Sequence, residues 1–337
     1  MKKNLINIIK FLIFFSISSF LFWYVYRGQN TTEILFTLKN EVNYYWIFLS
    51  LFCGLLSHIS RTIRWNMLIE SLGKKPRTIN TFLAVMVGYF ANLALPRMGE
   101  ISRCGLISKY ENISFTKLVG TVVLERVLDI MMLIVFLLIA LSTQFSVISH
   151  FFSNNPEVST KLSKIFASTN TLYVVATILI AIWFLRKKFK NTSIFIKIDQ
   201  TISNFMAGFR AIKALDHKIY FILHTVFIWI MYYLMTYICF FSFGFTSNLP
   251  AIAGLTVFVM GAFGMVAPVQ GGIGAWHFMV IGTLLVYLPE VSNIENMSKS
   301  FALVVHGSQT AMIIILGSLS VIALPIANRK QTKLTKA

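Results

Sequence analysis

The chain has 337 residues, of which 56% are hydrophobic and 12% are charged, about half the charged fraction of an ordinary soluble domain. This composition excludes a soluble protein and indicates a polytopic membrane protein, because several apolar runs reach the roughly 20 residues that cross a bilayer. The formal net charge of +18 does not indicate nucleic-acid binding, because the basic residues lie between the apolar runs rather than in one patch. The three cysteines are widely spaced and form no metal or redox motif, so we expect neither a metal nor a cofactor.

Six apolar runs are predicted as full crossings, and their approximate ranges are 5–26, 42–60, 118–142, 170–185, 219–243 and 300–326. The first run resembles a signal peptide, but it is too long and lacks a cleavage site, so we interpret it as a retained crossing. Two further regions, 80–108 and 251–288, are apolar but interrupted by proline and glycine. Each predicts two short helices that meet at a break. The predicted fold is therefore an all-α polytopic membrane domain over 1–337, with about six crossings and two broken re-entrant hairpins.

The distribution of basic residues predicts the orientation of the chain. If each broken region enters and leaves on one face, six crossings place both termini on the same face. Of the 30 lysines and arginines, 24 then lie on that face and five on the other, while Arg126 lies inside a crossing. Cytoplasmic loops carry such an excess of positive charge, so both termini are predicted to be cytoplasmic.

Two cytoplasmic segments lie outside the crossings. In 194–215, isoleucines and phenylalanines recur at steps of three and four between polar residues, which predicts an amphipathic helix in the membrane interface. Its basic residues would attract anionic lipid head groups whether it is a connector or a functional element. The C-terminal segment 327–337 is predicted to be a short basic tail.

Both interrupted regions contain a proline that is followed by glycine, residues that break helices. The stretch GYFANLALPRMGEISR at 88–103 contains the expected breaking residues Pro96 and Gly99, and the stretch GAFGMVAPVQGGIGAWH at 261–277 contains Pro268, Gly271, Gly272 and Gly274. Unpaired backbone groups are costly in hydrocarbon, so such breaks persist where protein or water covers them. An odd number of crossings separates the two regions, so they enter from opposite faces, as in an inverted repeat with a substrate site near the midplane. The alternative is that each break is only a packing kink.

Charged residues gather after the first break and in the crossing that follows it. Glu125, Arg126 and Asp129 lie roughly 10–15 Å from the cytoplasmic end of that crossing, where charges normally face a cavity or one another. In a structural interpretation, Arg126 pairs with Asp129, and Glu100 pairs with Arg64 or Arg103. In a functional interpretation, the arginines bind the phosphate of a lipid head group, to which their planar fork is suited. The residues of the predicted head-group site are Asn92, Arg97, Glu100, Arg103, Glu125, Arg126, Asp129, Gln270 and His277.

The end of the second crossing carries the motif RTIRW. Arg61, Arg64 and Trp65 are predicted to be interfacial anchors, because arginine and tryptophan are common at the level of the lipid head groups.

Several motifs occur in an order that resembles a known family. They are RTIRW at 61–65, GYFAN at 88–92, PRMGE at 96–100, Arg103, ERVLD at 125–129 and PVQGGIGA at 268–275. Over about 40–325 the chain resembles the transmembrane domain of lysylphosphatidylglycerol synthetase, also called the flippase-like membrane protein family. The resemblance implies a bacterial inner-membrane protein that moves lipids between leaflets, with anionic or aminoacylated phospholipids or lipid-linked glycans as its partners.

The chain departs from this family in two respects. Two-domain members carry a soluble aminoacyltransferase domain that this sequence lacks, so we expect no synthetase activity. His277 stands where the family commonly has glutamate, and we expect an uncharged hydrogen-bonding role for it rather than that of a catalytic base.

The leading hypothesis is a lipid flippase or scramblase, alone or as a homo-oligomer. The stretch GGIGAW lacks the strand–helix context of a dinucleotide fold, so it predicts no nucleotide cofactor. One alternative is an intramembrane enzyme of lipid or glycan synthesis, with His277, Glu125 or Asp129 as acid–base residues. Another is an accessory subunit that positions a separate synthetase.

Overall fold

The structure is a computed structural model that describes residues 2–28, 31–154, 215, 217–267 and 269–329. All regular elements within these residues are helical, which confirms the all-α class. In chain order they are α1 (Lys2–Tyr26), α2 (Thr31–Asn40), α3 (Tyr44–Glu70), α4 (Thr78–Ala94), α5 (Met98–Glu111), α6 (Phe115–Asn154), α10 (Lys218–Tyr237), the short 3-10 helix η1 (Ile238–Ser242), α11 (Ala251–Val266), a second 3-10 turn η2 (Gln270–Gly272), α12 (Ala275–Tyr287) and α13 (Ile294–Ala327). Three of them are long and apolar enough to cross a membrane by length and composition, namely α3, α10 continued by η1, and α13.

The predicted crossings at 5–26, 42–60, 118–142, 219–243 and 300–326 coincide with α1, α3, α6, α10 with η1, and α13. Helix α3 continues to Glu70, well past the predicted end at residue 60, so the motif RTIRW lies inside a helix. Helix α6 bends at Gln144, whose φ and ψ of −134° and 31° are not helical. The predicted crossing 170–185 and almost all of the amphipathic segment 194–215 lie outside the described residues, as does most of the tail, so the exact number of crossings stays a prediction.

Both interrupted regions form the expected pairs of short helices. In the first hairpin α4 and α5 pack closely, because Gly88 and Gly99 bring the two backbones together, and the Asn92 Oδ1 accepts a hydrogen bond from the Gly99 N–H at 2.7 Å. The break lies at residues 95–97, as Pro96 predicts. Gly99 lies within α5, so its predicted role in the break is wrong: its missing side chain permits close packing instead.

The second hairpin pairs α11 with α12. Its connection contains Gly271, Gly272 and Gly274 with φ values of 57°, 77° and 82°, a region that glycine adopts without strain, so the prediction that they interrupt the helix is confirmed. Pro268 lies outside the described residues. Entry of either hairpin from one membrane face stays a prediction.

The helices fall into two groups with matching contacts, α3–α6 and α10–α13. Helices α3 and α10 pack antiparallel, as shown by the hydrogen bond from the Ser50 Oγ to the Met235 carbonyl at 2.6 Å and by the 2.8 Å contact between Ser60 Oγ and His224 Nδ1. Helix α4 packs on α13 just as α11 packs on α6, and α5 packs on α6 just as α12 packs on α13. When α3, α4, α5 and α6 are matched in order with α10, α11, α12 and α13, each of these helix–helix contacts in one group has its counterpart in the other. This is the relation expected of an inverted repeat.

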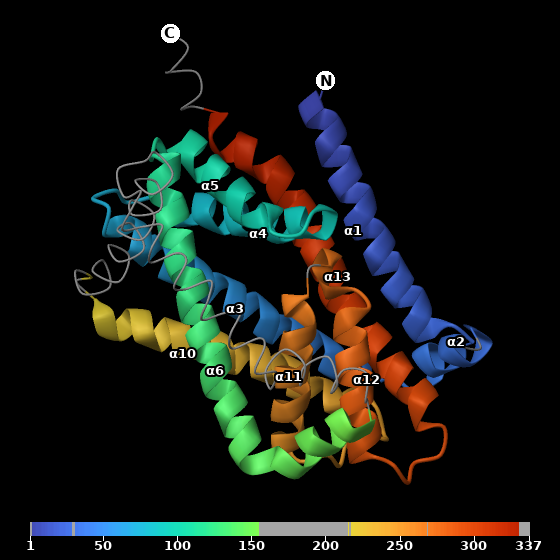
Figure 1. The fold of residues 1–337 in the computed structure, drawn as a ribbon. Coiled ribbons are helices and arrows are strands. Elements are labelled where there is room, and N and C mark those ends of the chain that lie inside the picture. Colours follow the sequence, from blue (N-terminus) through green and yellow to red (C-terminus); the bar gives the residue numbers. More distant parts are fainter. Residues whose placement is uncertain (1, 29–30, 155–214, 216, 268, 330–337) are drawn as a thin grey trace, which may run out of the picture.

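The two hairpins approach each other from opposite ends of α13 and meet at their tips (Figure 1). At one end, Asn80 near the start of α4 exchanges hydrogen bonds of 2.9 and 3.0 Å with Asn328, which follows α13. At the other end, α12 finishes shortly before α13 begins. At the tips, the Gln270 Nε2 donates a hydrogen bond to the Ala94 carbonyl at 2.7 Å. The contact between the tips therefore joins the two halves.

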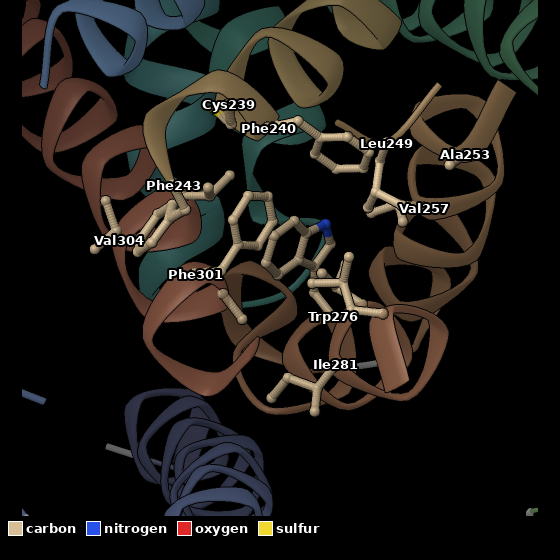
Figure 2. Packing of buried hydrophobic residues seen from close by; sticks show 14 of the residues in the cluster. Cys239, Phe240, Phe243, Leu249, Ala253, Val257, Trp276, Ile281, Phe301 and Val304 are labelled. Atoms are coloured by element: carbon tan, nitrogen blue, oxygen red, sulfur yellow. The ribbon is translucent and has the colours of Figure 1, made fainter. Parts of the chain in front are cut away.

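Each half has its own hydrophobic core. In the second half Phe240, Phe243, Phe301 and Trp276 pack together between η1, α12 and α13, as Figure 2 shows. In the first half a second cluster surrounds Trp65 at the junction of α3, α4, α5 and α6. The charged residues of α3, α5 and α6, such as Arg64 and Arg103, border this second cluster.

Candidate functional site

Seven charged side chains from three helices form one connected cluster, called here the arginine–carboxylate cluster. Each helix contributes at least one pair of residues three or four positions apart, which share one helix face. The members are Arg61 and Arg64 from α3, Glu100 and Arg103 from α5, and Glu125, Arg126 and Asp129 from α6.

The deepest part of the cluster surrounds Arg64, whose side chain is fully buried. Its guanidinium lies 3.0 Å from an Asp129 oxygen and 3.4 Å from a Glu125 oxygen. Asp129 also accepts from both terminal nitrogens of Arg61 at 3.1 Å. Glu125 and Asp129 therefore share a helix face, as predicted, and both are paired with arginines.

Arg103 completes the buried part. Its guanidinium lies 2.5 Å from Glu125 and stacks over the Trp65 ring at 4.5 Å. The Trp65 Nε1 in turn donates to the Thr121 Oγ1 at 2.9 Å. The prediction of Arg61, Arg64 and Trp65 as interfacial anchors is therefore wrong, because all three are buried inside the protein.

The rim of the cluster is formed by Arg126 and Glu100, which lie 2.6 Å apart. The Arg126 side chain is 45% exposed and also lies 3.6 Å from Asp129, so the predicted pair of Arg126 and Asp129 is confirmed. The predicted pairing of Glu100 with Arg64 or Arg103 is wrong. Those two arginines are occupied by the deeper carboxylates, which leaves Glu100 to Arg126.

The charges of the cluster do not cancel. Four arginines face three carboxylates, so the cluster carries a surplus of one positive charge. A cavity of about 10 Å³ lies between Arg61, Tyr89, Asn92 and the Glu100–Arg126 pair, which is room for about one water molecule. The Glu100 Oε2 is buried without a hydrogen-bond partner among the described residues. The Glu100–Arg126 rim is therefore the more exposed part of the cluster, since the Arg61, Arg64 and Arg103 side chains are at most 5% exposed.

Aromatic and histidine side chains extend the cluster toward α10, and sequence reasoning missed them. Arg61 lies 6.0 Å from the Tyr232 ring, the Tyr232 and Tyr89 hydroxyls are 3.3 Å apart, and the Tyr89 ring packs on His58 at 4.6 Å. The spacing of His58, Arg61 and Trp65 at helical steps of three and four was the available signal for a polar face on α3.

The other predicted site residues lie apart from the cluster. Arg97 is exposed at the first break with a left-handed φ of 64°, and it follows the proline that ends α4. Gln270 is buried between the hairpin tips, and its backbone N–H donates a hydrogen bond to the Ser18 Oγ of α1 at 3.0 Å. The predicted site is thus divided between the cluster and the second hairpin.

His277 lies near the tip of the second hairpin. Its Nδ1 accepts the Gly274 N–H at 3.2 Å, so that nitrogen carries no proton and the ring is uncharged in this arrangement. The His306 ring lies 4.8 Å from it, and the His306 Nε2 donates to the Gly271 carbonyl at 2.9 Å. Within the described part of the chain, no group of three or more histidine, cysteine or acidic residues could hold a metal ion.

Comparison with known proteins identifies the family. The model of the lysylphosphatidylglycerol synthase TM region matches residues 7–317. A UPF0104 membrane protein of Methanocaldococcus jannaschii is 31% identical over 131 residues, which are 38% of this chain and 36% of that protein, so the similarity spans about a third of the relative's length. No solved structure matches the chain. The chain is a membrane protein and belongs to the family of the lysylphosphatidylglycerol synthase TM region.

Proposed function

We propose that this protein is a lipid flippase or scramblase of the bacterial cytoplasmic membrane, with both termini in the cytoplasm. Its substrate is a lipid with a phosphate-bearing head group, either an anionic or aminoacylated phospholipid or a lipid-linked glycan. The observation that carries the proposal is the surplus positive charge of the arginine–carboxylate cluster, combined with the exposure of Arg126 at its rim.

A surplus charge within the membrane is costly unless an anion or water compensates it. A lipid phosphate supplies that anion, and the planar guanidinium of Arg126 can donate two parallel hydrogen bonds to it. Glu100 competes with the phosphate for the same guanidinium. When no lipid is bound, Glu100 holds the Arg126 guanidinium in place. Binding of the phosphate to Arg126 then releases Glu100.

The other members of the cluster hold this rim in place. Arg61, Arg64 and Arg103 are at most 5% exposed in their side chains and are already paired with carboxylates. Their role is to fix α3, α5 and α6 relative to one another. Arg97, exposed at the neighbouring break, is the second candidate contact for the phosphate, and its left-handed backbone is the kind of local strain that occurs at binding sites.

The contact between the hairpin tips is the proposed barrier to passage. Gln270 and Ala94 connect the two halves where the two broken hairpins meet. A head group that moves from the cluster toward the second hairpin must pass this contact. The hydrogen bond between the tips must therefore open during each translocation.

The test is transport by the purified protein in liposomes with fluorescent phospholipids, aminoacylated phospholipids and lipid-linked sugars. Arg126→Gln is expected to lower the rate about tenfold, the effect of losing roughly 1.4 kcal/mol of head-group binding. Arg126→Lys keeps the positive charge but loses the planar guanidinium, so its transport rate should lie between those of the wild type and Arg126→Gln. Arg27→Gln, the same change at an exposed arginine outside the cluster, is the matched control. Absence of movement of any of these lipids by the wild-type protein would remove the basis of the proposal.

A further inference from the structure

Gly307, in the middle of α13, faces open space. Several helical glycines of the described chain lie against a neighbour: a Cβ at Gly54 would come within 2.7 Å of Met235, and one at Gly261 within 2.7 Å of Trp276. Such close approach is the usual reason for a small residue in a membrane helix. At Gly307 no atom lies within 4 Å of the Cβ position. The space left free by this glycine is therefore not used by the described protein.

That space belongs to an apolar groove between α3 and α13, with a volume of about 750 Å³. Phe48, Leu51 and Leu55 line it from α3, and Ala311 and Ile315 line it from α13 beside Gly307. The hydroxyl groups of the residues that line the groove are hydrogen-bonded to backbone carbonyls. Ser308 donates its hydroxyl to the Val305 carbonyl at 3.0 Å, and Tyr44 donates its hydroxyl to the Leu38 carbonyl at 2.7 Å. The groove therefore presents hydrocarbon to an occupant.

The length of the groove is slightly greater than the depth of one leaflet. It extends from Tyr44 to Leu55 along α3, about 17 Å, and from Leu303 to Leu316 along α13, about 20 Å. Half of a bilayer core is about 15 Å. Tyr44 and Tyr45 are exposed at the start of α3, and exposed aromatic residues mark the head-group level of membrane proteins. The groove thus begins at that level and ends near the midplane.

The groove is open to the lipid-facing surface, since Phe48 and Ile315 on its two walls are 69% and 59% exposed. An exposed apolar surface of a membrane protein is covered by lipid acyl chains. The length of the groove fits a single chain of one leaflet better than a crossing helix, which would span the roughly 30 Å of the whole bilayer core.

We propose that this groove binds one acyl chain of a phospholipid from the leaflet on the α2 side, with Gly307 providing the room for it. The site is distinct from the arginine–carboxylate cluster, whose α3 residues lie farther along the helix than Leu55. The inference does not depend on translocation, because a bound chain can stabilise the packing of α3 on α13 in a protein with any activity.

The experiment uses a phospholipid that carries a photoreactive diazirine in the acyl chain. The full-length protein is reconstituted with this lipid, extracted in mild detergent and separated from free lipid, and only then irradiated. Mass spectrometry counts the retained lipids and locates the cross-links. The wild-type protein is expected to retain about one lipid that labels the peptides around Leu51 and Gly307.

Gly307→Leu adds a side chain whose Cβ has no neighbouring residue within 4 Å, so it is expected to fold. It is expected to lower the retained lipid about tenfold, since it displaces roughly two methylene contacts. Ala311→Leu is a second variant with the same expected direction. Gly120→Leu is the matched control, because Gly120 also faces open space in a helix but lies outside the groove. Equal retention by the wild type and Gly307→Leu would overturn the proposal. So would retained lipid whose cross-links avoid both groove helices, or a disulfide between two copies that carry Ala311→Cys.

Discussion

Loss of the Glu125 carboxylate is the most direct test of the arginine–carboxylate cluster. Glu125 is fully buried and pairs with Arg64 and Arg103. In Glu125→Gln the shape is kept but the negative charge is lost. Breaking a buried ion pair from one side costs roughly 3–5 kcal/mol, because a charge remains buried without its partner.

The contacts of the two arginines place the expected cost within that range. Arg64 retains Asp129 at 3.0 Å, so it stays paired in the variant. Arg103 loses its only carboxylate contact in the described chain and keeps the Trp65 ring at 4.5 Å, an interaction worth about 0.5–2 kcal/mol. The expected loss of stability is therefore near the lower end, about 3 kcal/mol.

The measurement is reversible unfolding of the purified protein in mixed micelles, compared among Glu125→Gln, Arg103→Met and the double variant. Because the double variant removes both charges of the pair, it should be less destabilised than the sum of the single variants, by about 1–3 kcal/mol. Glu290→Gln, the same change at an exposed glutamate, should stay within about 0.5 kcal/mol of wild type. A loss below about 1 kcal/mol for Glu125→Gln, or strict additivity, would refute the assignment of Glu125 as the buried centre of the cluster.

Two further predictions concern the hairpins. Gly99→Ala should destabilise the protein by about 1–3 kcal/mol in the same unfolding assay, because the new Cβ would overlap the Gly88 carbonyl oxygen. Gly105→Ala on the same helix is the control, because its Cβ meets no neighbouring residue and should not change the stability. Equal stability of the two variants would contradict the close packing of α4 and α5. Gln270→Ala removes the hydrogen bond to the Ala94 carbonyl, which contributes about 1 kcal/mol. Amide hydrogen exchange at the end of α4 should therefore become about fivefold faster. Unchanged exchange would show that other contacts hold the hairpin tips together.

The sequence was informative where one residue determines the local backbone. Pro96 and the glycines at 271, 272 and 274 predicted the two breaks, because their effects on the chain act within a few residues. The end of α3 was predicted too early, because Arg61 and Arg64 resemble residues at the membrane surface. Their burial depends on Asp129 and Glu125, which are more than 60 positions away in the chain, and a local pattern contains no information on that contact.

The partner of Glu100 was wrong for a related reason. Glu100 and Arg103 lie three apart on one helix, a spacing that permits pairing, and only the packing of α5 on α6 decides the competition. Glu125 takes Arg103 in the buried interior and leaves Glu100 at the rim with Arg126. Charge and spacing thus predicted which residues gather, but not which of them pair.

The two halves of the molecule share an arrangement but differ in chemistry. Glu100 is the third residue of α5 and His277 is the third residue of α12, so they occupy equivalent positions in the two hairpins. Glu100 belongs to a cluster with a surplus positive charge, whereas His277 is uncharged and bonded to the backbone of its own hairpin. If the protein moves an anionic lipid, as proposed, its head group therefore gains ion pairs at the cluster and none from His277. Under the proposed function, the two halves would therefore be alike in arrangement but unequal in their attraction for an anionic lipid.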